Sequence, residues 1–196
     1  MARNCLTYSD TEGDAFLPDL ASSLNNLGTS LRDLGRREDA LKAAQEAVDI
    51  YRRLAKDRPD AFLTDLAMSL NNFGTMLGEL GRREDALKAA QEAVDIRRRL
   101  AKDRPDAFLP DLACSLGALG SCLHAATQLH DAVETFKEGV QTLKPAFLKL
   151  PSAFAPLMGS LLSDYISHAK ELGEMPDMEL LKPIVDKFEE IKDKGE

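Results

Sequence analysis

The sequence predicts an all-α fold in which helical hairpins stack into a solenoid. Residues 14–59 are followed at once by a near copy, residues 60–105, and only seven of the 46 aligned positions differ. The composition favours helices, being rich in alanine, leucine and charged residues and without tryptophan. In such an array each unit packs mainly on its neighbours, so the length counts repeats and not domains.

Each unit is expected to contain two helices. In the first unit, apolar residues recur at three- and four-residue spacing and form one stripe, and Gly35 is expected to end this helix. The stripe consists of Leu20, Leu24, Leu27 and Leu31. A second helix is expected from about Arg37 to Asp57, with a packing face of small residues that includes Ala40 and Ala44. We expect these alanines and Gly28 to let the two helix axes approach closely.

Proline is expected to mark the boundaries between units. Pro59 is expected to stop the second helix, and Asp60 to cap the next one. The predicted divisions are a lead-in (1–13), repeat 1 (14–59), repeat 2 (60–105), repeat 3 (106–151), and a degenerate repeat 4 with a C-terminal capping helix (152–196). Ser152 is expected to cap the fourth unit. The final helix, roughly from Asp177 to Lys194, has the polar outer face that ends a solenoid.

The charge pattern argues against nucleic acid as a partner. The net charge is -8, and residues 14–105 hold 16 acidic and 16 basic side chains, whereas phosphate binding needs clustered lysine and arginine. The one basic run, Arg97 to Arg99, is expected on a solvated helix face. Neither a secretion signal nor an apolar run long enough to span a membrane is found, so a cytoplasmic location is expected. Cys5, Cys114 and Cys122 are expected to be free thiols.

The spacing of small and apolar residues resembles that of the tetratricopeptide repeat family. In the first unit the matching residues are Leu24, Leu27, Gly28, Leu31, Ala40, Ala44 and Pro59, and they recur in the next two units. The LNNLG stretch from Leu24 to Gly28 is similar to the LNNLA stretches of kinesin-light-chain-type repeats, and the long period fits that subtype. The resemblance implies a right-handed stack of about eight helices in about four repeats, with a concave groove lined by the first helix of each repeat.

The resemblance also suggests which residues bind a partner protein or peptide. Six of the seven differences between the first two units fall in the first helix, where either selection for a ligand or neutral drift explains them. The predicted groove residues are Asn25, Asn26, Thr29, Arg32, Met68, Asn71, Asn72, Thr75, Glu79, Ser121 and His124. Side-chain amides suit a peptide backbone because they both donate and accept hydrogen bonds. For Asn26 and Asn72, a bond to the neighbouring helix is an equally good interpretation.

Catalysis, metal and cofactors are not expected. The sequence shows no phosphate loop, and its histidines and cysteines do not have the spacing of a metal site. Recognition of an acidic C-terminal tail by a carboxylate clamp is not expected either, since only Asn72 matches the clamp residues. We therefore expect a non-enzymatic interaction scaffold. The alternative is a self-associating array, joined through its N-terminal repeat, or the sensor or spacer part of a larger signalling protein.

Overall fold

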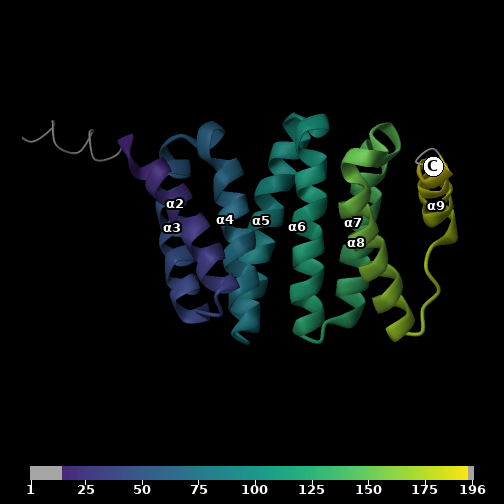
Figure 1. Cartoon of the computed structure of the whole chain (residues 1–196), viewed down its shortest axis with the longest axis horizontal. Helices are drawn as coiled ribbons and strands as arrows, with labels where there is room; N and C mark the ends of the chain where they lie inside the picture. Colours follow the sequence, from purple (N-terminus) through teal and green to yellow (C-terminus); the bar gives the residue numbers. More distant parts are fainter. Residues whose placement is uncertain (1–14, 194–196) are drawn as a thin grey trace, which may run out of the picture.

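The computed structural model describes residues 15–193, and every element in this range is an α-helix. The helices pair in chain order as hairpins (Figure 1), which confirms the predicted all-α solenoid. Their bounds are α2 (Leu17–Asp33), α3 (Arg37–Asp57), α4 (Pro59–Glu79), α5 (Arg83–Asp103), α6 (Pro105–Ala125), α7 (Leu129–Lys149), α8 (Pro151–Glu171) and α9 (Met178–Asp193). The predicted lead-in 1–13 and Cys5 lie outside the described residues.

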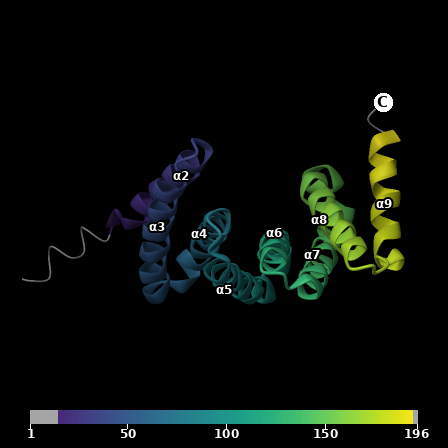
Figure 2. The ribbon, with the colours of Figure 1, turned by 90° about the horizontal axis from the view of Figure 1, so that it is seen from below.

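The hairpins stand side by side and form an arch. Figure 2 shows α4 and α6 on the inner side of the arch and α5 and α7 on its outer side, with α2 and α9 at the two ends. The inner side is thus formed by the first helix of each hairpin. Two clusters of buried side chains run through the array. One lies among α2 to α5 and the other among α5 to α9, and Leu100 and Cys122 pack against both.

The turn within each hairpin uses a left-handed backbone residue. Gly35, Gly81 and Gly173 have φ angles of 75°, 74° and 74°, as expected where a glycine ends a helix. The same place in the third hairpin is taken by Thr127, with φ at 62°. A β-branched residue is strained in this region, so the third turn stores strain that the others do not.

The links between hairpins differ from the expectation. α3 ends at Asp57, just before Pro59 as expected, but Pro59 also begins α4, because its missing N–H costs nothing in the first turn of a helix. Arg58 is the N-cap residue, and its guanidinium lies 4.8 Å from the centre of the Phe62 ring. The expectation that Asp60 caps α4 was therefore wrong. The same correction applies to Ser152, since α8 begins at Pro151.

Glycine sets the separation of the two helices in a hairpin. A Cβ atom added at Gly28 would lie 3.3 Å from the carbonyl oxygen of Ala40, and one at Gly74 would lie 3.3 Å from that of Ala86. At Gly120 the added atom would lie 2.7–2.9 Å from three atoms of the fully buried Phe136 ring. These distances confirm that small residues allow the helix axes to approach closely.

Half of the leucine stripe of α2 is exposed, in contrast to its copies, while Leu24 and Leu31 are half-buried. Leu20 and Leu27 are 45% and 49% exposed, whereas Leu66 and Leu112, the counterparts of Leu20, are 5% and 6% exposed. The counterparts are covered by the preceding hairpin. No helix among residues 15–193 packs on this side of α2, so the stripe remains an open apolar face.

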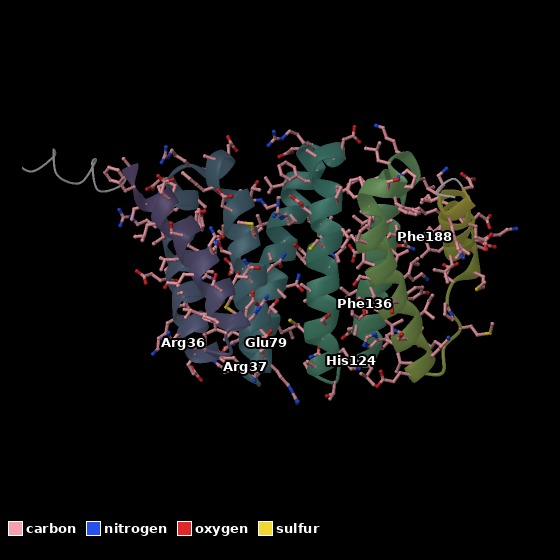
Figure 3. All side chains as sticks on the ribbon, in the orientation of Figure 1. Arg36, Arg37, Glu79, His124, Phe136 and Phe188 are labelled. Atoms are coloured by element: carbon pink, nitrogen blue, oxygen red, sulfur yellow. The ribbon has the colours of Figure 1, made fainter. Side chains whose placement is uncertain are left out.

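The last helix closes the array through a few specific contacts. The backbone N–H of Leu180 donates to the Asp177 carboxylate at 3.0 Å, and this bond lowers the pKa of Asp177. The backbone N–H of Asp177 in turn donates to the Tyr165 hydroxyl at 3.0 Å. Phe188 stands 4.7 Å from Phe147, measured between ring centres (Figure 3).

Among the described residues, no helix has the length and apolar character needed to cross a membrane. The expected cytoplasmic location stays a prediction.

The packing at Gly120 leads to a stability prediction. Gly120→Ala should lower the free energy of unfolding by about 1–3 kcal/mol, because the new methyl group overlaps the Phe136 ring. Gly159→Ala is the matched control, since Gly159 is also inside a helix but an added Cβ there meets no atom within 4 Å. The control should gain up to about 1 kcal/mol from helix propensity. Urea denaturation followed by circular dichroism measures both, and equal midpoints for the two variants would contradict the packing model.

Candidate binding groove

One face of each first helix is left open on the inner side of the arch. We call these positions the groove row, and most of its members are small and uncharged. In α2 they are Ser22, Asn26, Thr29 and Asp33; in α4 they are Met68, Asn72, Thr75 and Glu79; in α6 they are Cys114, Ala118, Ser121 and Ala125. Their spacing of three or four residues keeps them on one side of each helix. The other sides of these helices pack on the second helices and on the neighbouring hairpins.

The hydroxyl groups of the groove row are oriented by their own helices. Thr29, Thr75 and Ser121 each donate to the carbonyl oxygen four residues earlier, at 3.2, 3.0 and 3.0 Å. Each hydroxyl oxygen keeps its capacity to accept a hydrogen bond. The row therefore presents acceptors, which suit the N–H groups of a bound chain.

A cavity of about 300 Å³ lies between α4 and α6, next to this row. Thr75 and Ser121 face it with the small residues Gly74, Gly78 and Ala118, and the one long side chain in its wall is that of the exposed Arg83 on α5. Because side chains are so short here, a bound segment can approach the backbone of both helices. This cavity brings together two of the residues predicted from the sequence.

Asn25 and Asn71 are bonded within the chain. Asn25 is only 4% exposed, and its side-chain amide donates to the Ser69 hydroxyl on the next first helix at 2.6 Å. Asn71 makes the equivalent bond to Ser115 at 2.8 Å. Both Asn Oδ1 atoms are buried and have no hydrogen-bond partner among the described residues. The structure thus assigns both amides to the contact between repeats, the role that the sequence had suggested for Asn26 and Asn72 instead.

The remaining predicted residues are distributed along the groove. Asn26 is exposed, Asn72 is half-buried, and Met68 is 43% exposed. Arg32 lies 3.6 Å from Asp33 on its own helix. Figure 3 places Glu79 and His124 along the same edge of the array, where the two helices of a hairpin are joined by a turn. His124 contacts Glu171 of α8 at 3.1 Å. Apart from Thr75 and Ser121, these residues are not brought together around one cavity.

Two of the sequence differences between the first units concern packing and not the groove. Met76, which replaces Ser30, is 2% exposed, and its Cε atom lies 3.4 Å from where a Cβ of Gly28 would be. Phe73, which replaces Leu27, packs against the same core. These residues face the preceding hairpin, so larger apolar side chains appear where a neighbour covers them.

Arg97 is a polar feature that the sequence did not indicate. It is 6% exposed, which corrects the expectation for this one residue of the basic run, while Arg98 and Arg99 are exposed as expected. Its guanidinium donates to the Asp111 carboxylate at 2.7 Å, and its Nε is buried without a partner among the described residues. The position is held by Tyr51 in the first repeat. Only the alignment of the first two repeats, in which Tyr51 takes the place of Arg97, could have suggested that the Arg97 side chain is buried.

The thiols near the groove are poorly ionised. Cys114 and Cys122 are free, as expected. Burial raises the pKa of both, and Asp111 raises that of Cys114 further while Arg97 opposes this. A raised pKa makes a thiol a weak nucleophile at neutral pH.

A second cavity, of about 820 Å³, lies away from the groove row. It runs between α3 and α5, and Leu63 and Leu66 of α4 and Leu123 of α6 also line it. Its walls carry charges of both signs, and the Arg52 guanidinium bridges it by bonding Glu92 at 2.5 and 3.2 Å. Arg98 and Glu138 repeat this pair 46 residues later, at 2.8 Å. Because these ion pairs recur with the repeat period, we assign this cavity to the repeat scaffold and not to the candidate binding site.

The fold and its groove define a helical-repeat scaffold, and comparison with known proteins gives the family. Residues 19–99 match the tetratricopeptide repeat family. This match covers most of the first two repeats and agrees with their sequence motifs, and the later hairpins continue the same period. No curated protein matches the sequence.

Solved structures show the same fold at low sequence identity. A Podosopora anserina protein with nearly identical TPR-like repeats of the kinesin light chain type is 16% identical, with a TM-score of 0.60 over 90% of this chain and 76% of that one. A singly substituted variant of that protein gives 0.64 at 16% identity, over 88% and 76%. Aspartyl phosphate phosphatase F from Bacillus subtilis gives 0.53 at 18% identity, over 87% of this chain and 49% of that one. The fold is therefore that of the kinesin-light-chain-like repeats.

The pair of Arg97 and Asp111 leads to a second stability prediction. Asp111→Asn should lower the free energy of unfolding by about 1–3 kcal/mol, because it leaves a buried guanidinium without its counter-charge. Arg97→Tyr should change it by less than about 1 kcal/mol, since Tyr51 fills the same place in the first repeat.

The double variant provides the control. In the Arg97→Tyr background, Asp111→Asn should cost less than about 0.5 kcal/mol, because no buried charge remains. Urea denaturation of the four proteins gives the coupling energy. Equal effects of Asp111→Asn in both backgrounds would show that Arg97 does not depend on Asp111.

Proposed function

We propose that the protein is a non-enzymatic scaffold that binds a segment of a partner protein along the groove row. The observation that carries the proposal is the open row of short side chains beside the cavity between α4 and α6. A continuous surface of this kind accommodates an extended or helical segment, as concave solenoid surfaces do. The raised thiol pKa values support a binding role in preference to nucleophilic catalysis.

The charge of the first helices specifies the partner further. The helices α2, α4 and α6 carry seven carboxylates but only one arginine, Arg32; the carboxylates are those of Asp19, Asp33, Asp60, Asp65, Glu79, Asp106 and Asp111. Three basic groups lie near the groove: Arg97 is buried against Asp111, Arg32 lies beside Asp33, and Arg83 of α5 is exposed in the wall of the cavity. Because the seven carboxylates outnumber these cations, a segment that carries lysine or arginine fits this side better than an acidic one.

A charge substitution in the groove tests this proposal. Thr75→Arg should reduce capture of the partner from an extract of the source cells at least about tenfold, because it fills the cavity and repels basic residues. Thr135→Arg on α7 is the matched control and should leave capture unchanged. Thr135 is also a helical threonine whose hydroxyl donates to the carbonyl four residues earlier, at 2.7 Å, although it is half-buried.

Quantitative mass spectrometry of the captured proteins gives the readout, and thermal melting checks that both variants stay folded. Raising the salt concentration should weaken the captured interaction, because surface charges are screened. Capture of the same proteins in equal amounts by Thr75→Arg and by the unchanged protein would refute groove binding.

A second candidate function is self-association through α2. Its open apolar face includes Phe16 and Leu34, 71% and 75% exposed, besides Leu20 and Leu27. The same face of α4 packs on α2 and α3, so its shape fits another helical hairpin. A second copy of the chain provides such a hairpin. An isologous contact of two α2 faces would bury these leucines in both copies.

Light scattering at about 50 µM tests self-association by mass action. The unchanged protein should be a dimer, and Leu27→Glu should be a monomer because it places a charge in the contact. Leu150→Glu, at a leucine 57% exposed in the link before α8, should stay a dimer. A strict monomer for the unchanged protein would exclude this function and leave groove binding unaffected.

A further inference from the structure

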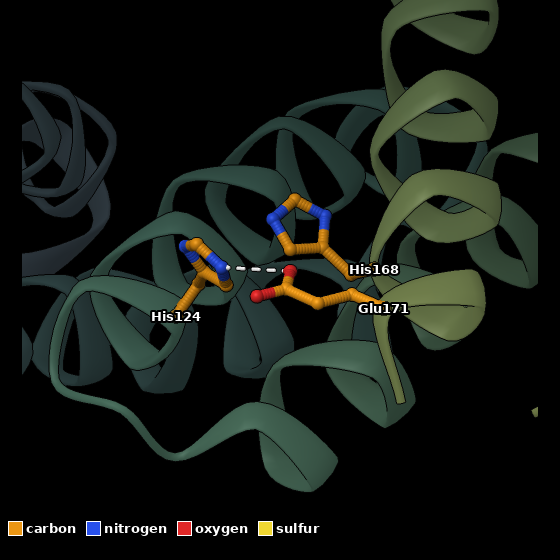
Figure 4. Close-up of side chains that lie close together, drawn as sticks. All are labelled: His124, His168 and Glu171. Carbon is orange, nitrogen blue, oxygen red and sulfur yellow. Dashed lines mark hydrogen bonds and ion pairs between the residues drawn. The ribbon is translucent and has the colours of Figure 1, made fainter. Parts of the chain in front are cut away.

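Three side chains that can bind metal ions meet where the third and fourth repeats pack together. His124 comes from the end of α6, while His168 and Glu171 come from the last turn of α8 (Figure 4). One ligand atom from each lies within 4.8 Å of the other two, and His124 Nε2 is 3.1 Å from Glu171 Oε2. His168 and Glu171 are three residues apart on one helix, so they project from the same face. The sequence could not show this cluster, because 47 residues separate His124 from Glu171.

The rings are held in place by contacts around them. His168 Nδ1 lies 2.7 Å from the carbonyl oxygen of Asp164. A carbonyl can only accept, so Nδ1 carries the proton and the lone pair of the neutral ring is at Nε2. The ring also stacks on Phe136, with 5.0 Å between ring centres, and meets His124 edge-on at 4.2 Å. A backbone carbonyl that fixes the tautomer is the usual outer contact of a metal-bound histidine.

The two histidines are specific to this one contact between repeats, whereas Glu171 stands where the earlier repeats have Asp33, Glu79 and Ala125. His124 stands where the earlier repeats have Arg32 and Gly78, and His168 stands where they have Ser30, Met76 and Cys122. Phe136, on which His168 stacks, replaces an alanine, Ala90. The strained turn at Thr127 comes just after His124 along the chain. The apolar packing between the first two repeats is thus replaced here by a group of nitrogen and oxygen donors.

We propose that His124, His168 and Glu171 bind one Zn²⁺ ion, which joins the third repeat to the fourth. Two imidazoles and one carboxylate suit zinc or a similar transition metal, while calcium and magnesium prefer oxygen ligands alone. Tetrahedral zinc places its ligand atoms about 3.3 Å apart, close to the 3.1 Å between His124 Nε2 and Glu171 Oε2. The ion takes the place of the proton that Nε2 donates to the carboxylate, and the neutral ring then carries its proton at Nδ1. Small side-chain rotations bring His168 within reach. Three protein ligands leave a fourth position for water.

Calorimetry with ZnCl₂ tests the site, using the full chain at pH 7.5 after removal of metals with a chelator. One Zn²⁺ per chain should bind, and the melting midpoint should rise by several degrees, because the ion binds only the folded chain. Glu171→Gln and His124→Ala should each weaken binding at least about tenfold. Glu171 is exposed, so Glu171→Gln should stay folded. His130→Ala should bind as the unchanged protein does, although His130 lies nearby, 3.3 Å from Glu174.

Cysteine thiols are the competing ligands, and Co²⁺ distinguishes them. Co²⁺ bound by nitrogen and oxygen should show visible d–d bands without the near-ultraviolet band of a thiolate complex. Three results would overturn the proposal: no Zn²⁺ binding at about 100 µM, equal affinity for Glu171→Gln and the unchanged protein, or binding that disappears when the thiols are blocked. In each case His124 and Glu171 would form only an ion pair between repeats.

Discussion

The approach of the two helices in each hairpin is the constraint on which the rest of the structure depends. With a Cβ position only 3.3 Å from a backbone carbonyl, Gly28 and Gly74 fix how near α2 and α4 lie to their partner helices. Ala40 and Ala86 complete the contact from the other side. Since close-packed interiors transmit small shifts, this separation sets the orientation of each hairpin relative to the next. The curvature of the arch, and with it the groove, follows from a contact between very small residues.

The sequence predicted well what repeats within one hairpin. The second helix begins at Arg37 and ends at Asp57 as expected, and glycine ends the first helix. These features depend on local periodicity and on backbone preferences, which a sequence shows directly. The error at Pro59 is also local, since proline fits both after one helix and in the first turn of the next. Helix type and order were therefore accessible, and the boundary residue was not.

The candidate site was less predictable, because it depends on neighbours that are distant in the sequence, 14 residues away for Arg97 and 44 to 47 residues away for the asparagines and histidines. The amides of Asn25 and Asn71 look like ligand contacts in the sequence, but the serine of the next first helix lies within hydrogen-bond reach. Arg97 looks solvated until Asp111 is placed beside it. His124 and His168 have no metal spacing along the chain and meet only in the stack. In each case the missing information was how one hairpin is placed against the next. Small residues determine this placement, and the polar residues in the sequence do not indicate it.

The bond between asparagine and serine also bears on how the number of repeats can change. Each of the first two units carries both partners, Asn25 with Ser23 and Asn71 with Ser69, and each asparagine bonds the serine of the following unit. A further identical unit inserted between them would form the same bonds, with its asparagine Oδ1 buried as those of Asn25 and Asn71 are. The third unit ends this series, because Gly117 and Leu161 occupy the two places and pack together. Growth by duplication is thus compatible with the N-terminal half of the array, while the C-terminal half has a fixed order.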